Sequence, residues 1–513
     1  MDKNSFIASI RESYSFQSST IYLGAGVYHG EILSDAKVRL PLRMMNRHGL
    51  VTGATGSGKT RTLQLIAEQL SAAGVPVFIP DVKGDLSGLA QASTPNAKIG
   101  ERAGALGIAY KPRSFPVELY SLSGNCGAQM RATITEFGPV LLSKVLGLNE
   151  VQTGVLMILF KYADDKGLPV VDLNDLKKLL NYLSDGPGAE EIRKSYGKIS
   201  GSTSGTMLRK IVVLEQEGIE QLFGERSFDI DDLFLKVDGC GVISLLNVSD
   251  IQDRPDVFST YMLALLAELY EKLPEVGDQD KPKLVFFIDE AHLLFRDASD
   301  AFMNQIDQVI RLIRSKGVGI FFCTQLTQDI PTIVLSQLGN RVHHVIRAFT
   351  PNDVKALKET IKTFPRSQYY DMEQQFTQLG TGQAFITVLD EKGIPTETVV
   401  THLVPPASVM GPLEEDDYKA RMRESELFKK YQEQIDPESA FEILGRRMER
   451  YEADPEEQVA KNQPGASRRR KEKSTLEQVL QSTTVRQIGR EVVRGVFGML
   501  FGKSGRSRSR SIF

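Results

Sequence analysis

A glycine-rich stretch near the N-terminus has the residue types and spacing that hold phosphate. Residues 53–60 read GATGSGKT and follow the apolar pair Leu50–Val51. Glycines let successive backbone N–H groups turn toward one anion, and a helix that begins here adds the positive end of its dipole. Lys59 is expected to reach the β- and γ-phosphates, and the Thr60 hydroxyl to hold Mg²⁺. The stretch therefore predicts binding of a nucleoside triphosphate, ATP, together with Mg²⁺.

The alternative is an ordinary glycine-rich turn that happens to end in Lys-Thr. The helical spacing of Leu63, Ile66, Ala67 and Leu70 disfavours it, because a phosphate loop must run directly into a helix. Residues of the loop and of the first helical turn are expected to contact the nucleotide: Gly53, Ala54, Thr55, Gly56, Ser57, Gly58, Lys59, Thr60 and Arg61.

A second stretch, KLVFFIDEAH at 283–292, has acidic groups that suit hydrolysis. Its apolar residues predict a buried strand. Asp289 and Glu290 follow at the carboxyl end, where open parallel sheets bind their ligands. Asp289 is expected to orient Mg²⁺, and Glu290 to act as the general base on the attacking water. A strand that ends in an ordinary acidic turn is the alternative, and the phosphate loop upstream disfavours it.

Two further strand ends carry polar residues that belong at the same edge of a parallel sheet. GIFFCTQ at 319–325 ends in Gln325, which is either a catalytic sensor of the γ-phosphate or a polar strand end. PDVKGD at 80–85 places Asp81, Lys83 and Asp85 at another strand end. These charges either touch the nucleotide or form a salt-bridged loop, and the sequence leaves both interpretations open.

Hydrolysis builds negative charge on the γ-phosphate, and an arginine from a neighbouring chain often neutralises it. Arg314 is the candidate for this catalytic role, with Arg311 second. Both lie at the end of a helix predicted at 301–316, just before the strand that leads to Gln325. A guanidinium suits forked binding to phosphate. The alternative is a helix-end arginine that the helix dipole favours.

The elements around these residues predict an α/β fold. Strands alternate with helices on either side of a long helical stretch, which indicates a mostly parallel sheet covered on both faces. The expected divisions are a β-rich lead-in at 1–45, a first core segment at 46–97, a helical insertion at 98–235, a second core segment at 236–406, a charged helical segment at 407–461, and a basic linker with an amphipathic tail at 462–513.

Composition narrows the class of protein. A net charge of −3 excludes a polycation that coats nucleic acid, and three widely spaced cysteines indicate a reducing compartment without a metal cluster. The N-terminus lacks the apolar core of a secretory signal, and no apolar run reaches the roughly 18 residues that span a bilayer. The sequence therefore predicts a cytoplasmic protein with no integral membrane segment.

The end of the chain combines an apolar stripe with a basic stripe at helical spacing. Arginines at 486, 490 and 494 form the basic stripe, and the apolar stripe consists of Val485, Ile488, Val492, Val496 and Met499. This pattern is typical of a basic amphipathic helix. Such a helix docks on the protein itself or on a neighbour, or binds an anionic membrane or nucleic acid.

Together, NRHGLVTGATGSGKT, DVKGDLSG, FIDEAHLLF and FFCTQ resemble the HerA-type ATPases of the FtsK/HerA group, most of all the bacterial YjgR-type subfamily. The resemblance implies a RecA-like P-loop NTPase core that hydrolyses ATP and assembles into a hexameric ring. It also implies that Lys59 and Thr60 are the phosphate-loop pair and that Asp289 and Glu290 form the second acidic motif. Gln325 matches the polar sensor of that group.

Three functions compete for a chain with these features. The first is a HerA-like ring motor that acts on DNA as a translocase or helicase-like ATPase. The alternative is a ring ATPase that remodels or gates a protein partner, through the insertion or the C-terminal tail, without DNA translocation. A nucleotide-controlled switch with little turnover is the third, and Glu290 disfavours it because a switch has less need of a water-activating acid. The core offers no basic stripe interleaved with aromatics that would single out DNA.

Overall fold

The structure, a computed structural model, describes residues 2–251, 254–296 and 300–453. The described residues divide into two compact units, one of 2–131 with Arg226–Gln434, and one of Ala132–Glu225 with 435–453. The predicted basic linker and amphipathic tail at 462–513 lie outside the described residues. Within the described part of the chain, no helix is both long enough and apolar enough to cross a membrane.

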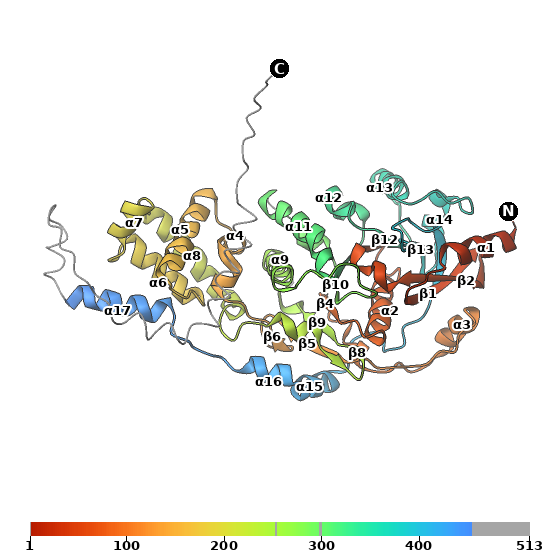
Figure 1. Ribbon diagram of the computed structural model, residues 1–513, viewed down its shortest axis with the longest axis horizontal. Helices are drawn as coiled ribbons and strands as arrows, with labels where there is room; N and C mark the ends of the chain where they lie inside the picture. The colour runs from red at the N-terminus through yellow and green to blue at the C-terminus, as the bar shows by residue number, and fades with distance from the viewer. Residues whose placement is uncertain (1, 252–253, 297–299, 454–513) are drawn as a thin grey trace, which may run out of the picture. The chain divides into compact units, whose positions relative to one another are not determined.

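The first unit is built on one twelve-stranded sheet (Figure 1). Its strands lie in the order β2-β1-β14-β13-β12-β3-β11-β10-β4-β9-β5-β6. From β12 to β6 in this order neighbouring strands are parallel, and the strands at the other end are antiparallel. This confirms the predicted α/β core with a mostly parallel sheet. The strands are β1 Thr20–Tyr28, β2 Glu31–Pro41, β3 Gly49–Thr52, β4 Val77–Asp81, β5 Val117–Ser121, β6 Ala128–Gln129, β9 Ile243–Asn247, β10 Leu284–Ile288, β11 Val318–Thr324, β12 Asn340–His343, β13 Gln383–Thr387 and β14 Val399–Leu403, beside a small hairpin of β7 Lys236–Val237 and β8 Cys240–Gly241.

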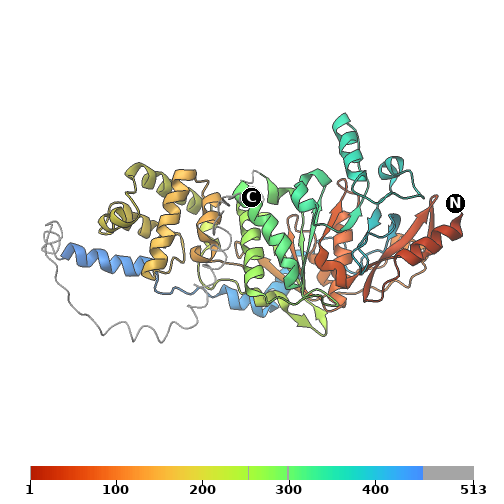
Figure 2. The same ribbon diagram turned by 45° about the horizontal axis from the view of Figure 1, so that its top comes forward.

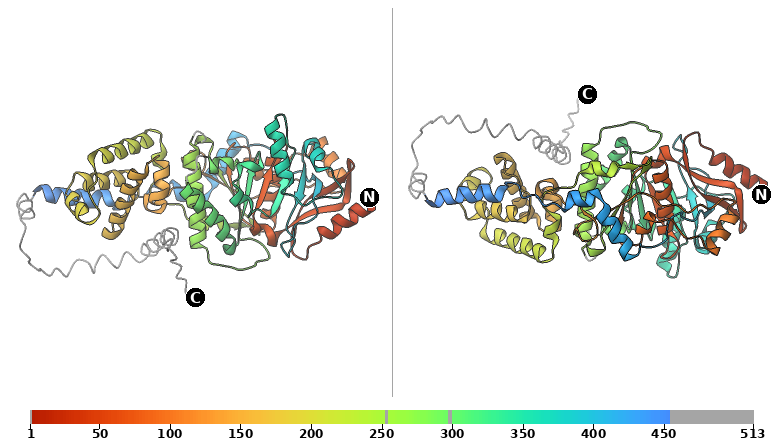
Figure 3. Two further views of the ribbon diagram at one scale, coloured as in Figure 1. Left: turned by 90° about the horizontal axis from the view of Figure 1, so that it is seen from above. Right: turned by 90° about the horizontal axis from the view of Figure 1, so that it is seen from below.

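Helices cover both faces of this sheet, which is why β4, β10 and β11 are buried along their whole length. Helix α2 crosses from β3 to β4 in one direction, whereas α9 and α11 cross back in the other. Right-handed crossovers therefore place α2 on one face and α9 with α11 on the opposite face (Figure 3). The helices of this unit are α1 Lys3–Ser13, α2 Lys59–Ala72, α3 Ala97–Ala105, α9 Pro255–Lys272, α10 His292–Phe295, α11 Asp300–Ile313, α12 Thr332–Leu335, α13 Pro351–Ile361, α14 Met372–Gln378, α15 Glu415–Glu424 and α16 Glu426–Gln432.

The central strands end together at one edge of the sheet. β11 lies between β3 and β10, with Thr324 paired with Thr52 and Ile288 paired with Phe322. β4 follows on the far side of β10. The carboxyl ends of β3, β11, β10 and β4 therefore form one edge, here called the phosphate edge.

The segment predicted as a small β-rich lead-in at 1–45 contributes two strands to the main sheet. β1 and β2 extend the main sheet, because β1 pairs with β14 through Gly24 and Leu403. A Cβ atom on Gly24 would lie only 2.1 Å from the His402 carbonyl oxygen, so this close approach requires glycine. The partner strand lies at the far end of the core, and a local hydrophobic pattern carries no signal for such a pairing.

The helical unit is shorter than the predicted insertion at 98–235. β5 pairs with β9 and β6 with β5, so the chain stays in the main sheet until about residue 131. Residues Arg226–Gln434 also belong to the first unit. The remaining helices are α4 Ile134–Val145, α5 Glu150–Lys166, α6 Leu173–Ser184, α7 Ala189–Ser195 and α8 Gly201–Gln216 (Figure 2).

The charged segment predicted at 407–461 is divided between the two units. Its helices α15 and α16 belong to the first unit, and α17, Ala440–Ala453, belongs to the helical unit. The start of α17 is bonded to α6: the Ser439 hydroxyl and the Phe441 N–H donate to Asp175 Oδ1 over 2.5 and 2.7 Å. A buried carboxylate that accepts several hydrogen bonds fixes this helix onto the bundle.

Candidate nucleotide site

The glycine-rich loop joins β3 to α2 at the phosphate edge. Gly53, Gly56 and Gly58 have φ values of 146°, 75° and 112°, which are strained for any residue with a Cβ atom. Gly58 is the N-cap of α2 and supplies no side-chain cap. The first backbone N–H groups of α2 therefore remain available to an anion bound in the loop.

Lys59 is the first residue of α2, and its side chain folds back over the loop. The Nζ atom donates hydrogen bonds to the carbonyl oxygens of Gly53, at 2.7 Å, and Ala54, at 3.2 Å. Burial lowers the pKa of Lys59, and the nearby Glu290 carboxylate opposes this change. Ser57 Oγ is also buried and has no hydrogen-bond partner among the described residues. A cation and an unpaired hydroxyl thus face one glycine-rich loop.

Strand β10 delivers its two acidic residues to the same edge. Asp289 and Glu290 are only 5% and 7% exposed. Burial, with the adjacent Glu290 charge, raises the pKa of Asp289 to about 7. Glu290 has a φ of 48°, a left-handed conformation that costs a residue with a side chain about 1–3 kcal/mol. Strain of this kind is concentrated at functional sites, where the surrounding structure holds it in place.

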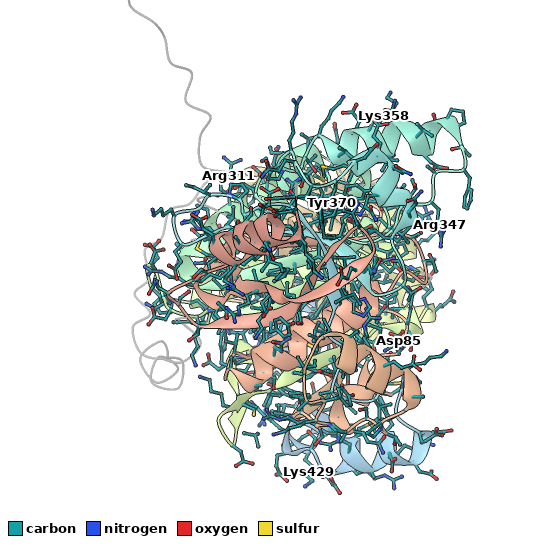
Figure 4. The ribbon with its side chains drawn as sticks, turned by 90° about the vertical axis from the view of Figure 1, so that its right-hand side faces the viewer. Asp85, Arg311, Arg347, Lys358, Tyr370 and Lys429 are labelled. Carbon is teal, nitrogen blue, oxygen red and sulfur yellow. The ribbon has the colours of Figure 1, made fainter. Side chains whose placement is uncertain are left out.

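The loop after β4 forms the ion pair that was one of the two interpretations of PDVKGD, and contact with the nucleotide stays a prediction. Asp81 turns inward and accepts hydrogen bonds from the N–H groups of Gly84, Asp85 and Leu86 over 2.8 to 3.2 Å. Figure 4 shows Asp85 on this loop. Lys83 reaches across to β10, where its Nζ lies 2.6 Å from Glu290 Oε1. The loop is therefore salt-bridged, and its partner is the candidate catalytic base.

Charge around Glu290 comes from several elements. Its Oε2 lies 3.4 Å from His292 Nδ1 and makes no hydrogen bond within the described structure. Burial would raise the pKa of Glu290, but the hydrogen bond and charge of Lys83 outweigh burial, with smaller effects from His292 and Lys59. The pKa of Glu290 therefore lies below its ordinary value, and the carboxylate is ionised.

The end of β11 lies between the phosphate loop and β10. The Thr324 hydroxyl donates to Asp329 Oδ2 over 2.6 Å, so it is engaged in holding the turn that follows. Gln325 is the next residue and is exposed. The preceding residue, Thr324, pairs with Thr52 at the end of β3. Gln325 therefore lies at the phosphate edge.

Arg314 lies at the other edge of the sheet. It follows α11 and precedes β11, which is parallel to β3, so it sits at the amino ends of these strands. Partial burial and the like charge of Arg47 lower the pKa of Arg314. Arg311, one turn earlier, is exposed (Figure 4), and it pairs with Asp307 over 2.8 Å. Neither arginine belongs to the phosphate edge of its own chain.

Sequence reasoning missed a histidine that braces the phosphate loop. His344 directly follows β12, the other neighbour of β3, and its ring is fully buried. The ring bridges the Thr62 hydroxyl of α2, at 2.9 Å, and the Gln383 carbonyl oxygen, at 3.0 Å. Because the carbonyl can only accept, Nδ1 donates to Gln383 and Nε2 accepts from Thr62. In the sequence, the one sign of this role was the pair His343–His344 next to the apolar residues of HHVIRAF.

Comparisons with known proteins identify the family of this chain. The family described as "Helicase HerA-like C-terminal" matches residues 28–506. The DNA double-strand break repair helicase HerA of Sulfolobus acidocaldarius is 22% identical over 399 residues, which cover 74% of this chain and 70% of the relative. The protein of the same name from Sulfurisphaera tokodaii is 22% identical over 390 residues, with coverage of 74% and 70%.

Among solved structures, the bacterial conjugative coupling protein TrwBdeltaN70, in an unbound form, matches with a TM-score of 0.49 and 14% identity. The match covers 79% of this chain and 93% of that chain.

The family match extends over most of the sequence, and it includes both the phosphate loop and the β10 acidic pair. The YjgR-type subfamily stays a prediction. The chain belongs to the HerA-like helicase family and is a P-loop ATPase.

Proposed function

We propose that the chain hydrolyses ATP at the phosphate edge and uses the energy to move along DNA. The main observation behind the proposal is that Lys59, after β3, and Glu290, after β10, lie close enough at the phosphate edge for their charges to interact. In addition, relatives of this chain are named DNA double-strand break repair helicases. A phosphate loop alone would support binding. A buried, ionised carboxylate at the same edge supports turnover.

The residues at this edge fit the nucleotide and its metal. The glycine loop, the start of α2 and the unpaired Ser57 hydroxyl offer donors to phosphate oxygens. Lys59 would exchange its two carbonyl partners for the β- and γ-phosphates. Thr60 and Asp289 would hold Mg²⁺, since magnesium is typically bound by one or two protein oxygens together with substrate phosphates and water.

The protein's own groups then divide the chemistry. Glu290 would accept the proton of the attacking water, because it is ionised and lies at the edge where the γ-phosphate would sit. Asp289, the last acidic residue before Glu290 on the same strand end, would hold the metal rather than the water. When bound, Mg²⁺ would neutralise charge that develops on the phosphate oxygens. Gln325 would contact the γ-phosphate from the end of β11.

Arg314 would complete the site in a neighbouring copy. Its place at the amino ends of the strands keeps it from the nucleotide of its own chain. The proposal therefore requires a ring, a hexamer by the resemblance to HerA-type proteins. In this ring Arg314 of one subunit would approach the phosphate edge of the next. Arg311 is the weaker candidate because it already pairs with Asp307.

Translocation distinguishes this function from a ring that remodels a protein partner. The test is ATP-dependent displacement of a third strand from a DNA triplex, with Glu290→Gln as the control that keeps the site but removes the base. We expect displacement by the wild-type protein alone, and weaker DNA binding as salt rises. Intact ATP hydrolysis with neither DNA binding nor displacement would refute a DNA motor and favour the protein-directed alternative.

A further inference from the structure

The ion pair between Lys83 and Glu290 is unexpected for a working general base. A base must be able to turn its carboxylate toward the attacking water, yet Lys83 Nζ lies 2.6 Å from Oε1 and holds that oxygen in place. The two residues are 207 positions apart and come from different loops. The side chain of Glu290 is only 9% exposed, whereas that of Lys83 is 48% exposed. The lysine is therefore the partner that can leave.

The backbone that carries Lys83 is held at both ends. Asp81 accepts three backbone N–H groups of the loop, as described above. The short 3₁₀ turn that follows, Ser87–Ala90, is bonded to the segment after β14. There Gly88 donates to the Gly411 carbonyl over 3.0 Å, and Leu413 donates to Ser87 Oγ over 2.9 Å. Only the four-carbon stem of Lys83 is left to move.

The carboxylate is more deeply buried than the lysine, and it lies on a strained backbone. Glu290 keeps a left-handed backbone, and its Oε2 makes no hydrogen bond among the described residues. The titratable groups that face it are Lys83 from the β4 loop, His292 from α10, Lys59 from α2 and the adjacent Asp289. Of these groups, Lys83 is the one that donates a hydrogen bond to the carboxylate among the described residues. Removing Lys83 therefore changes the base without touching the phosphate loop.

We propose that Lys83 is a releasable latch on Glu290, which holds the carboxylate while no DNA is engaged and lets it go when the DNA substrate binds. The latch rests on the proposed function, since DNA is the ligand that opens it. Half of the lysine side chain faces solvent, so an outside phosphate can compete with Glu290 for the ammonium group. Lys83 acts through Glu290 and is a positioning residue.

The test compares steady-state ATP hydrolysis of four proteins without DNA. Lys83→Met removes the charge and keeps the stem, Lys83→Arg keeps the ion pair, and Lys98→Met is a control on an exposed lysine of α3. We expect Lys83→Met to raise kcat about five-fold, the factor that one half-exposed ion pair supports. The KM for ATP should stay near the wild-type value. Lys83→Arg and Lys98→Met should match the wild type.

A second arm shows whether the gain passes through the base. Adding Glu290→Gln to Lys83→Met should abolish the gain, and DNA should stimulate Lys83→Met less than it stimulates the wild type. A kcat that falls or stays constant in Lys83→Met overturns the latch. If Lys83→Met does not fold, Lys83→Gln replaces it, and the same rise in kcat is expected.

The two proposals fail separately in this design. If DNA stimulates the wild type and Lys83→Met shows no gain, the latch is refuted and the DNA motor stands. If Lys83→Met gains activity through Glu290 but DNA stimulates neither protein, the lysine restrains the base and DNA is not what releases it. That second result overturns the latch as stated.

Discussion

Replacing His344 by leucine tests whether a buried, neutral ring braces the phosphate loop. The ring donates to the Gln383 carbonyl and accepts from the Thr62 hydroxyl, and leucine can do neither. An unsatisfied buried polar group costs about 1–3 kcal/mol, so His344→Leu should lower the free energy of unfolding by about 2–4 kcal/mol at pH 8. The loss of stability is at the lower end of this range if the Thr62 hydroxyl donates to another acceptor in the variant.

The pH dependence of this loss has a definite sign. Burial, with the neighbouring His343 charge, lowers the pKa of His344 to about 3 in the folded protein. An unfolded histidine has a pKa of about 6.5, so at pH 5 only the unfolded wild-type chain binds this proton, which favours unfolding by about 2 kcal/mol. Leucine binds no proton in either state. The stability gap between wild type and His344→Leu should therefore narrow by about 2 kcal/mol from pH 8 to pH 5.

Equilibrium urea unfolding at both pH values, followed by far-ultraviolet circular dichroism, measures this gap. His48 and His343 are also buried, but they are present in both proteins and cancel in the difference. His29→Asn, which replaces an exposed histidine away from the phosphate loop, is the control for the loss of a histidine as such. A gap that stays constant between pH 8 and pH 5 would show that His344 titrates normally and does not brace the loop as a neutral ring.

Two other substitutions test the nucleotide site. Lys59→Ala should weaken ATP binding by at least about 10-fold in isothermal titration, because the phosphates lose a charged hydrogen-bond donor; unchanged affinity would remove Lys59 from the site. Arg314→Ala should bind ATP normally and hydrolyse it poorly. Mixed rings of Arg314→Ala with Glu290→Gln should then recover part of the rate, since some interfaces regain both groups. If mass spectrometry shows mixed rings and no activity returns, Arg314 does not act in a neighbouring subunit.

The parts of the fold that could be predicted from the sequence are those with local signals. The stretch GATGSGKT needs glycines at fixed positions and a helix directly after it, and both requirements are visible within twenty residues. KLVFFIDEAH shows its burial in its own apolar run. Because parallel strands end at one edge, these two stretches were expected to meet, and the strand order brings them together across β11.

What the sequence could not show depends on contacts between distant segments. The pairing of β1 with β14 depends on strands more than 370 residues apart, and the pair Lys83–Glu290 joins residues 207 apart. Neither the strand pairing nor the ion pair produces a periodic pattern within a short stretch of the sequence. The predicted limits of the helical insertion were wrong for a related reason. β5 and β6 are short strands in a mainly helical stretch, and they join the main sheet because β5 pairs with the distant strand β9.

The rate of ATP hydrolysis with and without double-stranded DNA tests the central claim most directly, that the phosphate edge hydrolyses ATP and DNA drives it. The account predicts a wild-type rate that rises with DNA. Glu290→Gln should bind ATP with near-normal affinity and hydrolyse it about 10²–10⁴-fold more slowly under both conditions, because only the general base is lost. Near-normal hydrolysis by Glu290→Gln, or a wild-type rate that DNA leaves unchanged, would contradict the account.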